Sequence, residues 1–128
     1  MPKIRVLLVD DHALFRQGIR ALMANSEYAE IVGEATDGRD AVEKVRQSAP
    51  QVVLMDIGMP EMGGLEATRR ILKEDSSIKV LALTQYEDTE YILSMLKAGA
   101  RGYISKTATA AELDNAIQTV QRGDSYLY

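Results

Sequence analysis

The chain has 128 residues, of which 46% are hydrophobic and 27% charged, a size and composition typical of one soluble globular domain. Its formal net charge of −4 argues against nucleic acid or an anionic membrane as the main partner of these residues. The lack of cysteine excludes disulfides and thiolate metal sites, and no apolar stretch reaches membrane-spanning length. We therefore expect a cytoplasmic protein, with secretion an alternative that nothing in the sequence favours.

Short, dense apolar runs alternate with stretches of helical spacing along the chain. Apolar density without alternation is typical of strands covered by helices on both faces. In chain order, the predicted strands are residues 5–9, 31–32, 52–55, 80–83 and 102–105. The apolar stripes of the predicted helices lie within residues 14–23, 41–45, 65–72, 92–96 and 113–120.

Several helix ends carry recognisable signals. Asp37 followed by glycine predicts a turn and a helix cap, and Pro50 closes the helix that follows. Thr109 and Glu112 have the spacing of a capping box, in which each side chain satisfies a free backbone N–H of the other residue. Gly123 supplies the stop of the last helix.

Five repeats of strand and helix predict an α/β fold, with right-handed crossovers and a parallel sheet between two helical layers. No linker or low-complexity tract is visible, so residues 1–128 are expected to form one domain. The tail SYLY at 125–128 has two equally favoured interpretations: the start of a further segment, or a segment packed on the last helix.

Four of the predicted strands end on polar, reactive side chains. Asp10 and Asp11 follow the first strand, Asp56 the third, Thr84 the fourth, and Lys106 the fifth. The carboxyl ends of parallel strands meet at one edge of a sheet, which is where open α/β sheets bind ligands. We therefore expect these side chains to form one site.

Acids gathered at such an edge require neutralisation. Two carboxylates about 4 Å apart repel by roughly 4 kcal/mol at an effective dielectric constant near 20. Mg²⁺ suits a site with few carboxylates, a backbone carbonyl and waters, and it leaves room for phosphoryl oxygens. Asp56 could then act as a nucleophile that forms an acyl phosphate. Thr84 and Lys106 would donate a hydrogen bond and a positive charge to the transferred group.

Each residue taken singly has a simpler interpretation. Asp10 and Asp11 would cap a helix, Thr84 would shape a turn, and Lys106 would be an exposed charge. Their occurrence at the same end of four strands favours the joint site. His12, the single histidine, is interpreted as an early-helix residue rather than a ligand or a base.

Motifs of several other functions are missing. The chain contains neither a Walker phosphate loop nor a dinucleotide-binding fingerprint. One histidine, no cysteine and no nucleophile elbow argue against a hydrolase triad. A flavin carrier of the same fold would need a phosphate-binding loop after the first strand, where this chain has acids that repel phosphate.

With these motifs in place, the chain resembles the receiver domain of two-component response regulators over essentially its whole length. The motifs that carry the resemblance are LVDDH at 8–12, VLMD at 53–56, MPEMGG at 59–64, LT at 83–84 and AGARGYISK at 98–106. The resemblance implies a flavodoxin-like fold with five βα units and strand order 2-1-3-4-5. It also implies a phospho-accepting signalling domain that assists its own phosphorylation and dephosphorylation, rather than a classical enzyme.

The resemblance assigns roles to the acids. Asp56 would accept a phosphoryl group from a sensor histidine kinase. Asp11, Asp56 and the carbonyl of Gly58 would bind Mg²⁺ directly, with Asp10 contributing mainly through water. Gly58 is smaller than the residue found there in many family members, so water would reach the phosphate more freely.

The resemblance also assigns a switch. Thr84 and Lys106 would contact the phosphoryl group, and Tyr103 would reorient upon activation. Independently of the resemblance, Tyr86, two residues past Thr84, could shield the phosphate from the side opposite Gly58. The face that changes would be built from the fourth helix, the fifth strand and the fifth helix, and a homodimer is expected on activation.

The segment DDHALFRQG at 10–18 resembles one subgroup, the NarL/FixJ transcriptional regulators. In these, a LuxR-type helix-turn-helix domain follows the receiver, and GDSYL at 123–127 is similar to the link into it. DNA binding would then require a C-terminal domain beyond these residues. The alternatives are a stand-alone phosphoryl relay and a phosphorylation-independent dimerisation module.

Overall fold

The computed structural model describes residues 2–59, 62–85 and 89–127. Tyr86 and the Pro60-Glu61 pair of the MPEMGG motif lie outside the described residues. The elements in chain order are β1 (Ile4–Val9), α1 (Ala13–Met23), β2 (Ala29–Ala35), α2 (Gly38–Ser48), β3 (Val52–Asp56), α3 (Gly64–Glu74), β4 (Lys79–Thr84), α4 (Thr89–Lys97), β5 (Gly102–Ser105), α5 (Ala110–Gln121) and β6 (Tyr126–Leu127).

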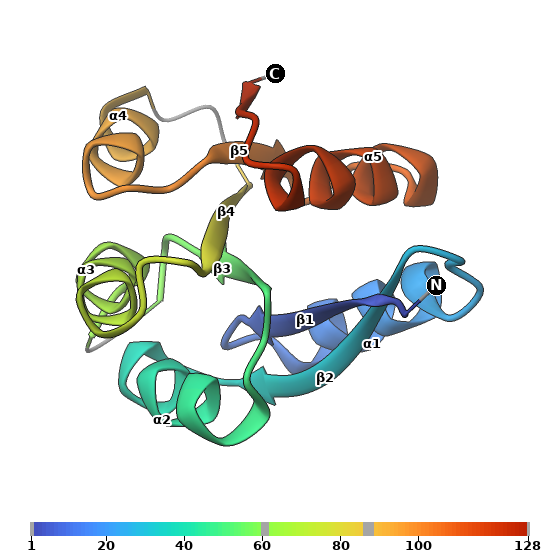
Figure 1. Cartoon of the computed structure of the whole chain (residues 1–128), viewed down its shortest axis with the longest axis horizontal. Coiled ribbons are helices and arrows are strands. Elements are labelled where there is room, and N and C mark those ends of the chain that lie inside the picture. The colour runs from blue at the N-terminus through green and yellow to red at the C-terminus, as the bar shows by residue number, and fades with distance from the viewer. Residues whose placement is uncertain (1, 60–61, 86–88, 128) are drawn as a thin grey trace.

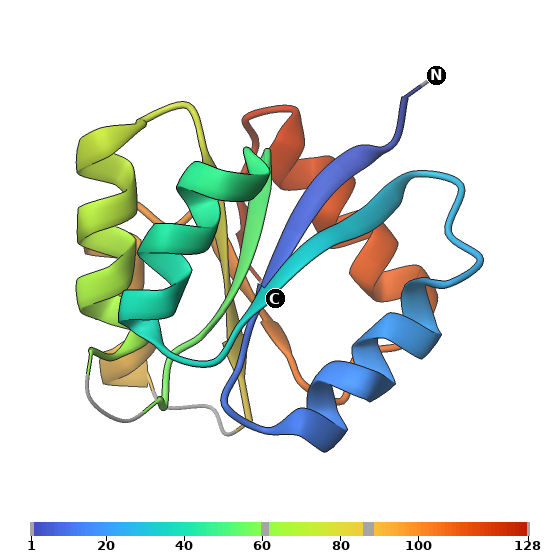
Figure 2. The same ribbon diagram turned by 90° about the horizontal axis from the view of Figure 1, so that it is seen from below.

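The strands form one parallel sheet in the order β2-β1-β3-β4-β5-β6. Helices α1 and α5 cover one face of this sheet, and α2, α3 and α4 cover the other (Figures 1 and 2). The predicted α/β class and the order 2-1-3-4-5 are confirmed. Among the described helices, none has both the length and the apolar character needed to cross a bilayer.

The two faces of the sheet bury separate hydrophobic clusters. On β1, Leu7 and Val9 pack toward α2 and α3, whereas Val6 and Leu8 pack toward α1 and α5. Strand β3 divides its side chains between the two faces in the same way. Successive strand residues point to opposite faces. Both faces are covered, so the central strands have unbroken apolar runs, at 6–9 in β1, 52–55 in β3 and 80–83 in β4.

The sixth strand was not predicted. Tyr126 pairs with Gly102 of β5, and the Tyr126 N–H donates to the carbonyl of Arg101 at 3.0 Å. The Tyr126 side chain is buried in the cluster on the α5 side. The tail therefore packs at Tyr126, on the sheet as well as on α5, and this packing is compatible with a further segment after it.

The local signals at helix ends are confirmed. Oδ1 of Asp37 accepts the Asp40 N–H at 2.7 Å at the start of α2. In α5, the Thr109 hydroxyl accepts the Glu112 N–H at 3.2 Å, and the Glu112 carboxylate accepts the Thr109 N–H at 2.9 Å. Gly123 follows the end of this helix with a φ of 94°, a left-handed conformation that glycine adopts without steric cost.

Candidate functional site

The carboxyl ends of β1, β3, β4 and β5 lie along one edge of the sheet, at the bottom of Figure 2. Asp10 directly follows β1, Asp56 ends β3 and Thr84 ends β4. Lys106 directly follows β5, and its N–H donates to the carbonyl of Thr84 at 2.8 Å. The strand order therefore brings together the side chains that the sequence places at four strand ends.

Three carboxylates meet at this edge. Asp10 is completely buried and Asp56 is 5% exposed, whereas Asp11 lies at the rim. One ligand atom from each of Asp10, Asp11, Asp56 and His12 can be chosen so that all lie within 4.8 Å of one another. The carboxylate oxygens are the donors that a hard divalent cation prefers, so the residues present fit Mg²⁺.

Lys106 bridges the two buried acids. Its Nζ lies 2.6 Å from Oδ2 of Asp10 and 3.4 Å from Oδ1 of Asp56. Its side chain is 10% exposed, and Nζ lies 4.7 Å from the centre of the Phe15 ring, where a cation is attracted to the aromatic face. The simpler interpretation of Lys106 as an exposed charge is therefore wrong. One ammonium among three carboxylates leaves the site with an excess of negative charge.

The environment of Asp56 shifts the pKa of its carboxyl group upward. Burial raises the pKa of its carboxyl group above the ordinary value, and the negative charge of Asp10 acts in the same direction. The Gly58 N–H donates to Oδ1 of Asp56 at 3.1 Å, which lowers the pKa, and Lys106 also lowers it. Burial has the largest effect, so a positive charge added near Asp56 would favour the ionised, nucleophilic form.

The contacts of Thr84 and Tyr103 in this structure are with β5 and the hydrophobic core. The buried Thr84 hydroxyl donates to the carbonyl of Ile104 at 3.4 Å. Tyr103 is half-buried on β5 and packs against the hydrophobic cluster on the α2–α4 face. A cleft of about 260 Å³ lies at this edge of the sheet, beside Asp56 and Lys106. It is lined by His12, Asp56, Ile57, Gly58, Gln85, Tyr91 and Lys106.

Sequence reasoning missed three neighbours of the acids. His12 is the N-cap residue of α1, and its Nδ1 lies 3.1 Å from Oδ1 of Asp10 and 3.1 Å from Oδ1 of Asp11. Arg16 donates from its guanidinium to the carbonyl of Asp10 at 2.7 Å. Phe15 lies beneath Lys106. All three residues belong to the segment that leaves β1 and enters α1. Their closeness in sequence to Asp10 and Asp11 was the one signal that could have identified them.

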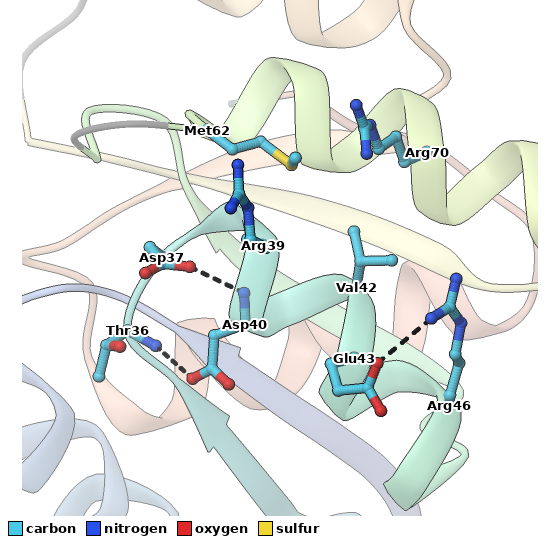
Figure 3. A pocket seen from close by; sticks show the side chains of 9 residues that line it. All are labelled: Thr36, Asp37, Arg39, Asp40, Val42, Glu43, Arg46, Met62 and Arg70. Carbon is cyan, nitrogen blue, oxygen red and sulfur yellow. Dashed lines mark hydrogen bonds and ion pairs between the residues drawn. The ribbon is translucent and has the colours of Figure 1, made fainter.

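A second cleft, of about 720 Å³, lies between α2 and α3 and contains none of the predicted site residues (Figure 3). Its acids are occupied in local contacts. Asp37 accepts the Asp40 N–H, the Asp40 carboxylate accepts the Thr36 N–H, and Glu43 pairs with Arg46. These bonds cap and stabilise α2, so the acids that line this cleft have a structural role.

Comparison with known proteins agrees with this geometry. The family model described as "Response regulator receiver domain" matches residues 6–118. The response regulator GacA of Pseudomonas viridiflava is 45% identical over 124 residues, which cover 97% of this chain and 58% of that protein. The transcriptional regulatory protein DegU of Brevibacillus brevis is 40% identical over 126 residues, which cover 98% of this chain and 53% of DegU. The chain thus spans a little over half the length of these curated relatives.

Solved structures of the same kind superimpose closely. A LuxR-family two-component response regulator from Aurantimonas sp. SI85-9A1 has a TM-score of 0.91 and 35% identity, covering 99% of this chain and 90% of that chain. The signal receiver domain of NarL from Mycobacterium tuberculosis has a TM-score of 0.90 and 31% identity, covering 96% of this chain and 99% of that chain. The chain therefore belongs to the response regulator receiver domain family, in its NarL/FixJ-like subgroup.

Proposed function

We propose that this domain accepts a phosphoryl group on Asp56 from a sensor histidine kinase, in a Mg²⁺-dependent reaction, and thereby controls transcription. The observation that carries the proposal is the meeting of Asp56 with Asp10, Asp11 and Lys106 at one sheet edge. A carboxylate nucleophile, an excess of acids and a buried ammonium are the parts that transfer of a phosphoryl group to aspartate requires.

Asp11, Asp56 and the Gly58 carbonyl would hold Mg²⁺, with Asp10 contributing mainly through water. When bound, the ion would neutralise the carboxylates and bind the phosphoryl oxygens. The Asp56 carboxylate attacks phosphorus, the new P–O bond forms, and the P–N bond to the kinase imidazole breaks, with its electron pair leaving on nitrogen. Lys106 lies close enough to exchange its contact with Asp56 for a phosphoryl oxygen.

The switch follows from the new charge. The Thr84 hydroxyl, which donates to Ile104 in this structure, turns to donate to a phosphoryl oxygen. That movement vacates space beside β5, and Tyr103 turns inward to fill it. The face of α4, β5 and α5 then changes shape, and a homodimer forms on it.

The output is proposed from the relatives. GacA and DegU carry regulator names and extend well beyond the part that this chain matches. We infer that the natural protein continues into a helix-turn-helix domain that binds DNA, and that it acts in the cytoplasm. A stand-alone phosphoryl relay is the second candidate, and the gene's sequence past Tyr128 separates the two.

Phosphate labelling tests the proposed function. Incubation with acetyl phosphate and Mg²⁺ should add the mass of one phosphoryl group to the intact protein. Asp56→Asn should abolish this gain, while Asp75→Asn, at an acid that binds Ser77 outside the site, should retain it. Equal labelling of Asp56→Asn would contradict the assignment of the acceptor. A phosphorylation-independent dimerisation module would gain no mass and would still sediment as a dimer.

A further inference from the structure

The imidazole of His12 faces the acids although most of its side chain is in solvent. Its side chain is 65% exposed, yet Nδ1 lies 3.1 Å from Oδ1 of both Asp10 and Asp11. His12 is the N-cap residue of α1, but its side chain makes no capping hydrogen bond. The ring thus takes no part in capping α1, and its Nδ1 lies within hydrogen-bond distance of Oδ1 of Asp10.

The backbone of His12 is held on both sides. Its N–H donates to Oδ1 of Asp10 at 2.8 Å, and its carbonyl accepts the Arg16 N–H at 3.1 Å. Arg16 is itself tied to the site, since its guanidinium binds the carbonyl of Asp10. With the backbone fixed in this way, placing the ring nitrogen beside the acids costs only the freedom of the side-chain torsions.

The separations match those between ligands of one metal ion. An octahedral ion with bonds of about 2.1 Å keeps neighbouring ligand atoms about 3.0 Å apart and opposite ones about 4.2 Å apart. The 3.1 Å distance from Nδ1 to Oδ1 of Asp11, which is a proposed direct ligand, corresponds to neighbouring positions. Ligand atoms of His12 and the three acids also lie within 4.8 Å of one another, so small movements would bring them around one ion.

We propose that His12 is a nitrogen ligand of the cation site, and that it strengthens the binding of first-row transition-metal ions such as Co²⁺ and Ni²⁺ relative to Mg²⁺. Imidazole suits these ions, whereas Mg²⁺ prefers oxygen donors. The inference rests on the proposed function, because it requires the cation site between the acids. It goes further by naming an additional ligand and the class of metal that this ligand selects.

Metal titrations of wild type and His12→Gln test the inference, with protein that carries no histidine tag. The chain has one histidine, so any imidazole effect arises from His12. Calorimetric titration should show Co²⁺ and Ni²⁺ binding more tightly than Mg²⁺ to wild type. His12→Gln should weaken Co²⁺ and Ni²⁺ by about tenfold or more, as loss of a ligand implies. Its Mg²⁺ affinity should stay within about twofold of wild type, since Mg²⁺ uses the oxygens.

The visible spectrum of bound Co²⁺ gives a second measurement. Its absorption should change between wild type and His12→Gln, because one nitrogen donor is replaced in the inner shell. If Co²⁺, Ni²⁺ and Mg²⁺ weaken equally in the variant, or none weakens, His12 is not a ligand and the inference fails while the proposed function stands. If wild type binds none of the three ions, the cation site of the proposed function fails as well. Thermal unfolding of His12→Gln establishes that the variant is folded.

Discussion

Asp56 illustrates how the burial of one carboxyl group carries a cost in stability. Its pKa is raised, first by burial and then by the charge of Asp10, so its native pKa lies above the unfolded value. The native state thus holds the proton more tightly than the unfolded state does. The protonated carboxyl group of Asp56 therefore contributes to the free energy of unfolding. This contribution is fully present below the unfolded pKa and is lost as pH rises through the native pKa. Above the native pKa, the ionised carboxylate destabilises the metal-free fold.

Asp56→Asn should therefore stabilise the metal-free protein. In EDTA at pH 7, we expect its melting temperature to exceed that of wild type by about 2–5 °C, the shift that roughly 1 kcal/mol produces in a domain of this size. The difference should shrink as pH falls toward the unfolded pKa of aspartate. Calorimetry from pH 4 to pH 8 measures it. Asp124→Asn, at an exposed acid paired with Arg122, is the control for charge alone. A melting temperature below that of wild type would contradict the electrostatic argument.

At the residue scale, sequence reasoning identified which residue types meet and missed how they contact one another. The sequence placed Asp10, Asp56 and Lys106 at strand ends, and the topology of a parallel sheet is enough to bring these strand ends to one edge. The contacts of the Lys106 ammonium with two acids and with the Phe15 ring depend on the torsions of its long side chain. His12 was interpreted as an early-helix residue, and the ring orientation that directs it to the acids could not be derived from a single sequence.

At the element scale, local signals were sufficient where the chemistry is local. The capping box of α5 and the Asp37 cap of α2 depend on residues within three positions, so pattern alone located them. Strand β2 was predicted too short, at 31–32 instead of Ala29–Ala35. It lies at the edge of the sheet and is largely half-exposed, with Glu30 and Glu34 in its span, so its apolar run is brief.

Strand β6 depends on a contact that only the fold creates. Gly102 lies so close to the tail that a Cβ atom there would be 2.0 Å from the backbone oxygen of Tyr126. A side chain on β5 at this position would occupy the space of the neighbouring strand. Glycine is required at 102 because of residue 126, which is distant in the sequence. No local pattern near the tail could therefore predict that β6 pairs with β5.

Two glycine substitutions should have opposite effects on stability. Gly102→Ala should displace β6 and cost about 1–3 kcal/mol, as other overpacked sites do. Gly18→Ala, in α1 with nothing near its added Cβ, should gain up to about 1 kcal/mol from helix propensity. Denaturant unfolding measures both changes. Hydrogen exchange should report faster exchange of the Tyr126 amide in Gly102→Ala alone. An unchanged rate there would mean that the tail does not depend on close approach to β5.

At the scale of the whole molecule, the two-layered core explains why the site lies where it does. Both faces of the sheet are filled by apolar side chains under helices, so polar groups can gather only at the strand ends. The parallel order directs every carboxyl end to the same edge. Fold class and site location were therefore predictable together, whereas the contacts inside the site were not.

The excess of acids at that edge should make the stability of the whole domain sensitive to divalent cations. Mg²⁺ that binds only the folded state should raise the melting temperature, by an amount equivalent to about 2.7 kcal/mol when its concentration is a hundred times the dissociation constant. Asp11→Asn should blunt this gain, because it removes a carboxylate at the rim while leaving the buried acids in place.

Differential scanning calorimetry at constant ionic strength measures the effect of Mg²⁺, with NaCl as the control for screening of charge. EDTA should restore the metal-free melting temperature. Because Asp11 is at the rim, its substitution should alter the metal-free melting temperature less than Asp56→Asn does. An equal response to Mg²⁺ in wild type and Asp11→Asn would show that the ion acts elsewhere. No response in wild type would mean that Lys106 alone already balances the acids, and the magnesium site would have to be abandoned.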